Sequence, residues 1–100
     1  MEIFKAKDND LFKVSISGRL DTNSAPELEK SVMEEIDGVK KLVLNLYNLE
    51  YISSAGLRVV LMLHKKMSSM GGTLIISHPK DEVMEVFDMT GFSSFLVFEE

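Results

Sequence analysis

Two adjacent serines stand where the sequence passes from a strand-like segment to a helical one, and they are the residues best placed to do chemistry. Ser53 and Ser54 precede Ala55, Gly56 and a long apolar helical stripe. A serine at such a turn is expected to cap the helix by accepting a hydrogen bond from a backbone N–H two or three residues further on. The same N–H groups and the positive end of the helix dipole favour an anion, so a phosphate on either hydroxyl would be tolerated. The position predicts a helix cap, a phosphorylation site, or both.

Motifs typical of enzymes are incomplete in this chain. The segment 52–56 resembles half of the G-x-S-x-G turn of serine hydrolases, but its first glycine is missing. No His–carboxylate pair can be assigned as base and orienting group, and neither glycine-rich pattern that cradles phosphates occurs. We therefore expect a protein that is not an enzyme. A small ligand-binding domain or a serine enzyme acting through Ser54 is the alternative, and a serine-reactive probe would detect it.

Asp21 and two histidines are the other side chains that could do chemistry. Asp21 follows a strand, but it lacks the neighbouring carboxylates and lysine that a phosphoaspartate acceptor needs, so the simpler expectation is a turn residue that bonds to its local backbone. His64 and His78 come from a helix and a loop, without a carboxylate at ligand spacing on the same face. The sequence predicts no metal site and no cofactor.

The composition is that of one small globular domain. The 100 residues are 45% apolar and 27% charged, and they include no cysteine, which excludes a disulfide scaffold and a thiolate metal site. The formal net charge of −5 disfavours direct binding to nucleic acid. The longest apolar run, 59–63, is far shorter than the ~20 residues of a membrane span, and the first residues do not resemble a signal peptide. We expect a cytoplasmic protein that does not bind a membrane.

Alternating and helical periodicities take turns along the chain, which is typical of an α/β fold. Residues 11–17 alternate as a half-buried strand that pairs with 2–6 in a hairpin, and 41–46 is a denser apolar run typical of a central strand. Ser24, with Glu27 three residues further on, predicts a capping box at the first helix. The predicted elements are strands 2–6, 11–17, 41–46, 72–77 and 94–98 and helices 24–37, 54–70 and 80–90, in the order β-β-α-β-α-β-α-β, forming a single domain over 1–100 with a mixed sheet of four to five strands and three helices mainly on one face.

Three segments together resemble the STAS family, and more narrowly its stand-alone bacterial anti-sigma factor antagonists. They are Gly18–Asn23 after a strand, Tyr51–Arg58 at a helix start, and Phe87–Phe92 near the end of the chain. Together with the order of elements, the resemblance covers nearly the whole chain. Many relatives continue into a C-terminal helix, whereas the sequence stops at Glu100, directly after the last predicted strand, so we expect this helix to be short or absent here.

The resemblance implies a partner switch controlled by phosphorylation. In that family the unphosphorylated antagonist binds an anti-sigma factor, which is also a serine kinase of the histidine-kinase-like ATPase type, and a sigma factor is freed. Phosphorylation of the antagonist breaks the complex, and a PP2C-type phosphatase resets it. The family's acceptor stands two residues before the glycine, which makes Ser54 the acceptor and Ser53, where the family usually has aspartate, the alternative. Asp21 matches the family's aspartate in the loop beside the acceptor.

The resemblance also implies a partner-binding surface around the acceptor. Gly56 is expected to let a partner's backbone come close, whereas Leu57 fits both a partly exposed anchor and packing beneath the helix. Methionines at helical spacing are interpreted as core residues. The alternative function is that of a STAS scaffold, or of a subunit of a signalling or lipid-transport complex, that is never phosphorylated. The predicted partner-binding residues are Asp21, Thr22, Asn23, Ser53, Ser54, Gly56, Leu57 and Arg58.

Overall fold

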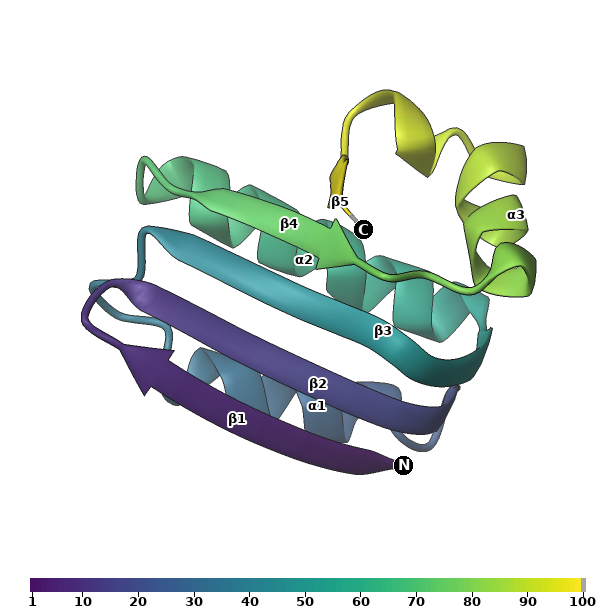
Figure 1. Cartoon of the computed structure of the whole chain (residues 1–100), viewed down its shortest axis with the longest axis horizontal. Helices are drawn as coiled ribbons and strands as arrows, with labels where there is room; N and C mark the ends of the chain where they lie inside the picture. Colours follow the sequence, from purple (N-terminus) through teal and green to yellow (C-terminus); the bar gives the residue numbers. More distant parts are fainter. Residues whose placement is uncertain (100) are drawn as a thin grey trace.

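A computed structural model describes residues 1–99 and shows a five-stranded sheet in the order β1-β2-β3-β4-β5 (Figure 1). Strand β1 runs antiparallel to β2, and the other neighbouring strands are parallel. The predicted order of elements and the mixed sheet are thereby confirmed. The elements are β1 (Glu2–Asp8), β2 (Leu11–Leu20), α1 (Ala25–Met33), β3 (Lys41–Ile52), α2 (Ser54–Ser69), β4 (Thr73–Ser77), α3 (Asp81–Met89), a 3-10 helix η1 (Phe92–Ser94) and β5 (Val97–Glu99).

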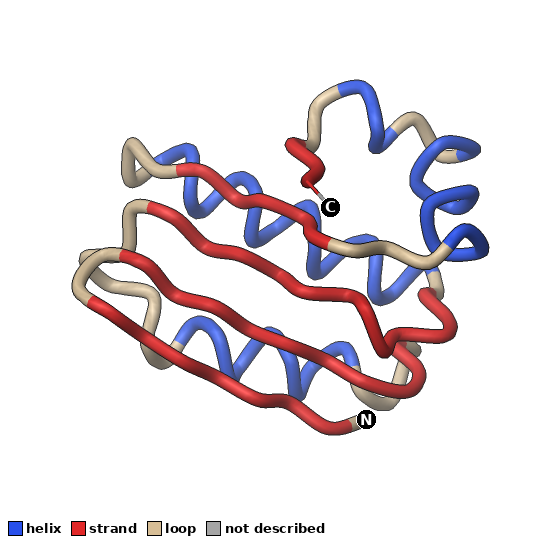
Figure 2. The backbone as a smooth tube through the Cα atoms, viewed as in Figure 1, coloured by secondary structure: helices blue, strands red, loops and turns tan. Residues whose placement is uncertain are grey.

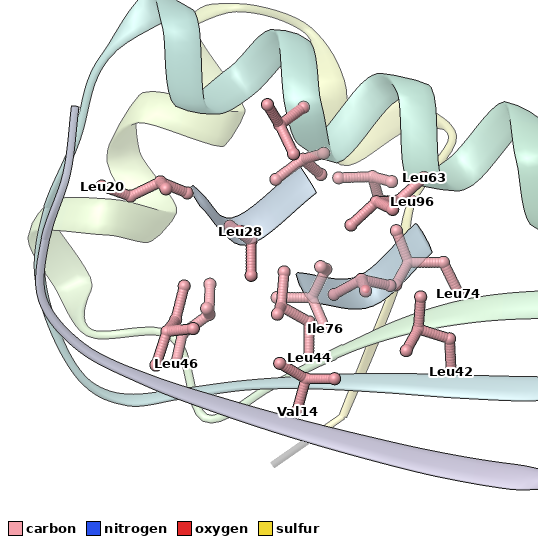
Figure 3. Close-up of a cluster of buried hydrophobic side chains, with 14 of the residues drawn as sticks. Val14, Leu20, Leu28, Leu42, Leu44, Leu46, Leu63, Leu74, Ile76 and Leu96 are labelled. Atoms are coloured by element: carbon pink, nitrogen blue, oxygen red, sulfur yellow. The ribbon is translucent and has the colours of Figure 1, made fainter. Parts of the chain in front are cut away.

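The core lies between the sheet and two of the helices. Helices α1 and α2 both lie behind the sheet, on the same face (Figure 2). Val14, Leu44 and Ile76 come from three neighbouring strands and, with Leu28 of α1 and Leu63 of α2, belong to one apolar cluster of fully buried side chains (Figure 3). Each such side chain stabilises the fold by roughly 1.5–3 kcal/mol on burial. The alternation along the strands thus fixes which face receives the helices.

Helix α3 lies beyond the end of β4 and closes that end of the core (Figure 1). Its Phe87 is fully buried. The Phe87 ring lies 5.6 Å from the ring of Phe98 in β5 and 6.4 Å from that of Phe92 in η1, measured between centroids. These aromatic contacts join the last three elements of the chain to one another.

Strands β2 and β3 are longer than the predicted segments 11–17 and 41–46. They end at Leu20 and Ile52. The register between them shifts twice near their ends. Alternation breaks at such irregularities, and the buried positions of β3 then come every third residue, at Leu46, Leu49 and Ile52. The alternating pattern therefore stops while the strand continues, and the extra residues carry both strands to the candidate site.

The first helix and the last strand are shorter than predicted. Helix α1 ends at Met33 rather than at residue 37, although Ile36 and Val39 are buried in the turns that follow it. The apolar spacing continues after the helix has ended, so it overestimates the length of α1. Strand β5 begins at Val97 rather than at residue 94, because a turn at Gly91 (φ 82°) leads into η1 first.

Candidate functional site

The carboxyl ends of β2 and β3 bring the two singled-out loops together. Leu20, the last residue of β2, pairs with Ile52, the last residue of β3. The backbone N–H of Ser53 then donates to the Leu20 carbonyl at 2.9 Å. The loop that begins at Asp21 and the start of α2 therefore lie side by side, at the right-hand end of the sheet in Figure 1.

Asp21 holds its own loop in shape. Its Oδ1 accepts hydrogen bonds from the backbone N–H groups of Asn23 (3.0 Å) and Ser24 (3.1 Å). The N–H bond from Ser24, then that from Asn23 and the nearby Arg19 charge, lower the pKa of the Asp21 carboxyl against the opposing effect of partial desolvation. The interpretation of Asp21 as a turn residue that bonds to its local backbone is confirmed.

The predicted capping box of Ser24 and Glu27 is wrong. Ser24 has helical backbone angles (φ −93°, ψ −20°), and its side chain makes no cap hydrogen bond. The Ser24 hydroxyl instead accepts from the Asp21 N–H at 2.9 Å and donates to the Arg19 carbonyl at 2.7 Å. Ser24 is almost fully buried and closes the Asp21 loop. Its hydroxyl makes its hydrogen bonds within this loop and none to the backbone N–H groups of the first turn of α1.

Ser53 and Ser54 have different roles at the start of α2. Ser53 is the helix cap: it has extended backbone angles, is half-buried, and accepts a hydrogen bond from the Gly56 N–H at 3.2 Å. Ser54 is the first helical residue, and its side chain is exposed. The prediction that a serine caps this helix is confirmed for Ser53, and the hydroxyl of Ser54 is accessible to solvent.

Of the backbone N–H groups in the first turn of α2, two are hydrogen-bonded within the described part of the chain and two are not. The N–H of Gly56 bonds to the Ser53 hydroxyl, and that of Leu57 bonds to the Ser53 carbonyl at 2.9 Å. Within residues 1–99, the N–H groups of Ser54 and Ala55 have no protein partner. Two unpaired donors at the positive end of a 16-residue helix favour an anion at this place.

Gly56 is required by the chain's own packing, which differs from the expectation that it admits a partner's backbone. It is buried, and a Cβ there would lie 2.8 Å from Leu20 Cγ, 2.9 Å from Ile52 Cγ1 and 3.0 Å from the Leu20 carbonyl oxygen. The last of these atoms is backbone and cannot move away as a side chain can. Glycine therefore lets the first turn of α2 rest directly on the end of β2.

The remaining predicted residues fall into an exposed and a buried group. Thr22, Asn23 and Arg58 are exposed, whereas Leu57 is only 7% exposed and belongs to the core, as the packing interpretation required. The interpretation of the helical methionines as core residues is confirmed too: Met67 is fully buried, and Met62 and Met70 pack against the cluster.

A stacked pair beside the site was not found from the sequence. The Arg19 guanidinium lies 4.1 Å from the ring centroid of Tyr51, and its Nε lies 4.0 Å from Asp21 Oδ2. Arg19 and Tyr51 are register partners on β2 and β3. Only the shifted register places them opposite each other, so the sequence carried no direct signal for the contact.

A groove between α1 and α2 opens next to Ser54. It has a volume of about 400 Å³, with apolar walls and one acidic and one basic side chain. From the sequence, Arg58 is predicted to bind a partner and the helical methionines are predicted to lie in the core, but a groove shared with α1 is not predicted. Its lining residues are Thr22, Ala25, Pro26, Glu29, Ala55, Arg58, Val59 and Met62.

A larger cavity of about 700 Å³ lies away from the serines, next to the start of α3. Tyr47, His78, Lys80 and Met84 are among its lining residues. Among residues 1–99 no three His, Cys, Asp or Glu side chains are grouped so that they could hold a metal ion. In the same part of the chain no helix is long and apolar enough to cross a membrane.

Sequence comparison links the chain to known regulators. The STAS domain family matches residues 3–100. BtrV of Bordetella bronchiseptica, named as a candidate anti-sigma factor antagonist, is 36% identical over 95 residues, which are 94% of this chain and 82% of that protein. The anti-sigma-B factor antagonist of Bacillus subtilis is 28% identical over 92% of this chain and 84% of its own length.

Solved structures share the fold. An anti-sigma factor antagonist candidate from Thermotoga maritima matches with a TM-score of 0.91 at 24% identity, over 98% of this chain and 86% of that one. The antagonist SpoIIAA matches in its unphosphorylated form (TM-score 0.81, 16% identity, 99% and 88% coverage) and in the phosphorylated form of the Bacillus protein (TM-score 0.78, 17% identity, 99% and 92% coverage).

These matches define the class to which the sheet and the serine turn belong, namely regulatory proteins rather than enzymes. The chain belongs to the STAS domain family and, by sequence and fold, to its anti-sigma factor antagonists.

Replacing Gly56 by alanine should destabilise the protein, although alanine is the better helix former. The added Cβ meets the Leu20 carbonyl, and overpacking of this kind costs about 1–3 kcal/mol. Urea unfolding of Gly56→Ala and of the wild type measures the loss, with Ser54→Ala as the exposed control that should stay within about 0.5 kcal/mol. Equal stability of all three proteins would contradict the close contact.

Replacing Asp21 by asparagine should make a pH-dependent difference to stability. Because folding lowers the Asp21 pKa, the ionised carboxylate stabilises the fold above the pKa of the unfolded chain, and this contribution is lost as the pH falls through the folded pKa. The difference in unfolding free energy between wild type and Asp21→Asn should therefore shrink below about pH 4. Urea unfolding at a series of pH values measures this difference. The two proteins have all other carboxylates in common, so the change of the difference with pH reports on Asp21. A constant difference would refute the assignment.

Proposed function

We propose that this protein is an anti-sigma factor antagonist whose binding is switched by phosphorylation of Ser54. Unphosphorylated, it binds an anti-sigma factor that is also a serine kinase of the histidine-kinase-like ATPase type, and a sigma factor is freed. The observation that carries the proposal is the exposed hydroxyl of Ser54 on the first turn of α2, beside the Asp21 loop. The names of the relatives support an anti-sigma factor as the partner.

Accessibility favours Ser54 over Ser53 as the acceptor. A kinase must bring the hydroxyl into line with the γ-phosphorus of ATP, so that the Oγ–P bond forms as ADP leaves. Ser53 is half-buried and already accepts a bond from Gly56 N–H, so its phosphorylation would disturb the cap. Ser54 is exposed and can be modified without losing that bond.

The surface around Ser54 suits a binding site that a phosphate can close. Thr22, Asn23 and Arg58 are exposed next to it, and the groove between α1 and α2 offers apolar walls to a partner. A phosphate adds a charge of about −1.5 to −2 at the edge of this groove. A partner that fits the uncharged surface would be expelled by desolvation and repulsion. Gly56 and Leu57 support this surface from beneath.

Resetting the switch requires hydrolysis of the phosphoserine. A PP2C-type phosphatase would transfer the phosphoryl group to water, which restores the Ser54 hydroxyl and releases inorganic phosphate. Both enzymes and the complex would act in the cytoplasm. In this scheme the protein is a substrate and a binding partner, and it catalyses neither step.

The first prediction of this proposal concerns the acceptor. The wild-type protein, used as bait in a lysate of its host, should capture an ATPase-type kinase, release it when ATP is added, and carry phosphate on Ser54 by mass spectrometry. Ser54→Ala should hold the same kinase in the presence of ATP, whereas Ser53→Ala should still be phosphorylated. Phosphate on the Ser54→Ala bait would refute the acceptor. An unmodified wild-type bait with ATP-insensitive partners would instead indicate a scaffold.

The second prediction concerns the charge. Ser54→Asp should bind the captured kinase at least ten times more weakly than the wild type, a loss of about 1.4 kcal/mol. Ser54→Asn has nearly the same size without the charge, so it should bind more tightly than Ser54→Asp. Calorimetry with the purified kinase measures the three affinities. Equal affinities for the aspartate and asparagine variants would rule out charge as the cause of release.

A further inference from the structure

We infer that Arg58 is the intramolecular partner of a phosphate on Ser54 and acts as a positioning residue for the modified side chain. This inference rests on the proposed acceptor, and it concerns what the phosphate contacts once it is present. It assigns to Arg58 a role within this chain in the phosphorylated state, in addition to the partner contact proposed for the unphosphorylated one.

The spacing of the two residues places them on one face of α2. Ser54 and Arg58 are four residues apart in a continuous helix, so their Cβ atoms are neighbours about one turn apart. Long side chains on a helix lean back toward its N-terminus, which is the direction from Arg58 to Ser54. Arg58 also lines the groove together with Thr22 and Ala55, so its side chain already lies near the loop and the first turn.

Arg58 is also a cation that the unmodified protein leaves unpaired. Among residues 1–99 the ion pairs join Lys5 to Glu35 and Arg19 to Asp21, and neither involves Arg58. Arg19, the other cation near the site, is stacked on Tyr51 and lies next to Asp21. The exposed Arg58 is therefore the guanidinium that can turn to a new anion without breaking an existing contact.

A phosphate on Ser54 would have hydrogen-bond donors on two sides, namely backbone N–H groups at the helix start and the Arg58 guanidinium. The unpaired N–H groups of Ser54 and Ala55 lie at the helix start, and the planar guanidinium of Arg58 can donate two parallel bonds to phosphate oxygens. Of the carboxylates beside the site, Asp21 is bonded within its own loop, and Glu29 lines the groove together with Arg58. Capture of Arg58 would also remove the basic side chain from the groove, so phosphorylation would change the partner surface at two points.

The second ionisation of the phosphate tests this contact directly. Phosphoserine can be installed at position 54 of the full chain by genetic encoding, and its pKa, ordinarily about 6, followed by phosphorus NMR. A guanidinium contact favours the dianion, so the phosphoserine pKa should be lower with Arg58 than in Arg58→Gln by about 0.3 units or more. Added salt at about 1 M should reduce the difference.

Two matched variants test whether the pKa change is specific to Arg58 or follows from the loss of any nearby positive charge. Lys65→Gln removes an exposed cation two turns further along the same helix and should leave the phosphoserine pKa unchanged, as should Arg19→Gln. An unchanged pKa in Arg58→Gln, or a rise of equal size in Arg19→Gln or Lys65→Gln, would overturn the inference. Because the phosphate is installed without the kinase, this outcome is independent of whether the host kinase modifies Ser54, which the pull-down decides.

Discussion

The contact between the first turn of α2 and the end of β2 determines the geometry of the site. The Ser53 N–H bonds to the Leu20 carbonyl, and Gly56 lies so close to Leu20 that no side chain fits between them. Leu20 also immediately precedes the Asp21 loop. One backbone position therefore contacts both loops, and the Ser54 hydroxyl stands on a turn that is hydrogen-bonded to and closely packed against the end of β2. A partner that recognises this surface meets a preformed shape, which lowers the entropic cost of binding.

The polar groups of the site divide into those that maintain the fold and those that face solvent. Asp21, Ser24 and Ser53 are bonded to backbone groups of their own loops. Ser54 and Arg58 are exposed next to them. Replacing a residue of the first kind is expected to destabilise the protein. A residue of the second kind can change in charge without altering the hydrogen bonds that hold the loops. A regulatory surface needs both, because the signal must alter the second kind while the first holds the shape.

The fold was predictable where one periodicity dominates, as in the alternating residues 11–17 and the helical stripe of α2. The candidate loops were predictable because helix starts and strand ends carry characteristic polar residues, and Ser53 caps α2 as its position required. What failed depends on contacts between segments. The register shifts that break the alternation near the end of β3, the bonds that divert Ser24 from capping, and the packing that requires Gly56 all involve a second strand or loop. A single stretch of sequence does not contain that information.

The position of the proposed acceptor one residue after the helix cap has a mechanical consequence. A phosphate on the cap itself would compete for the Gly56 amide and loosen the first turn, and with it the contact on Leu20. A phosphate on Ser54 leaves the Ser53 bond in place and adds charge where two amides are unpaired. The switch would then act through surface charge and shape, with the backbone unchanged.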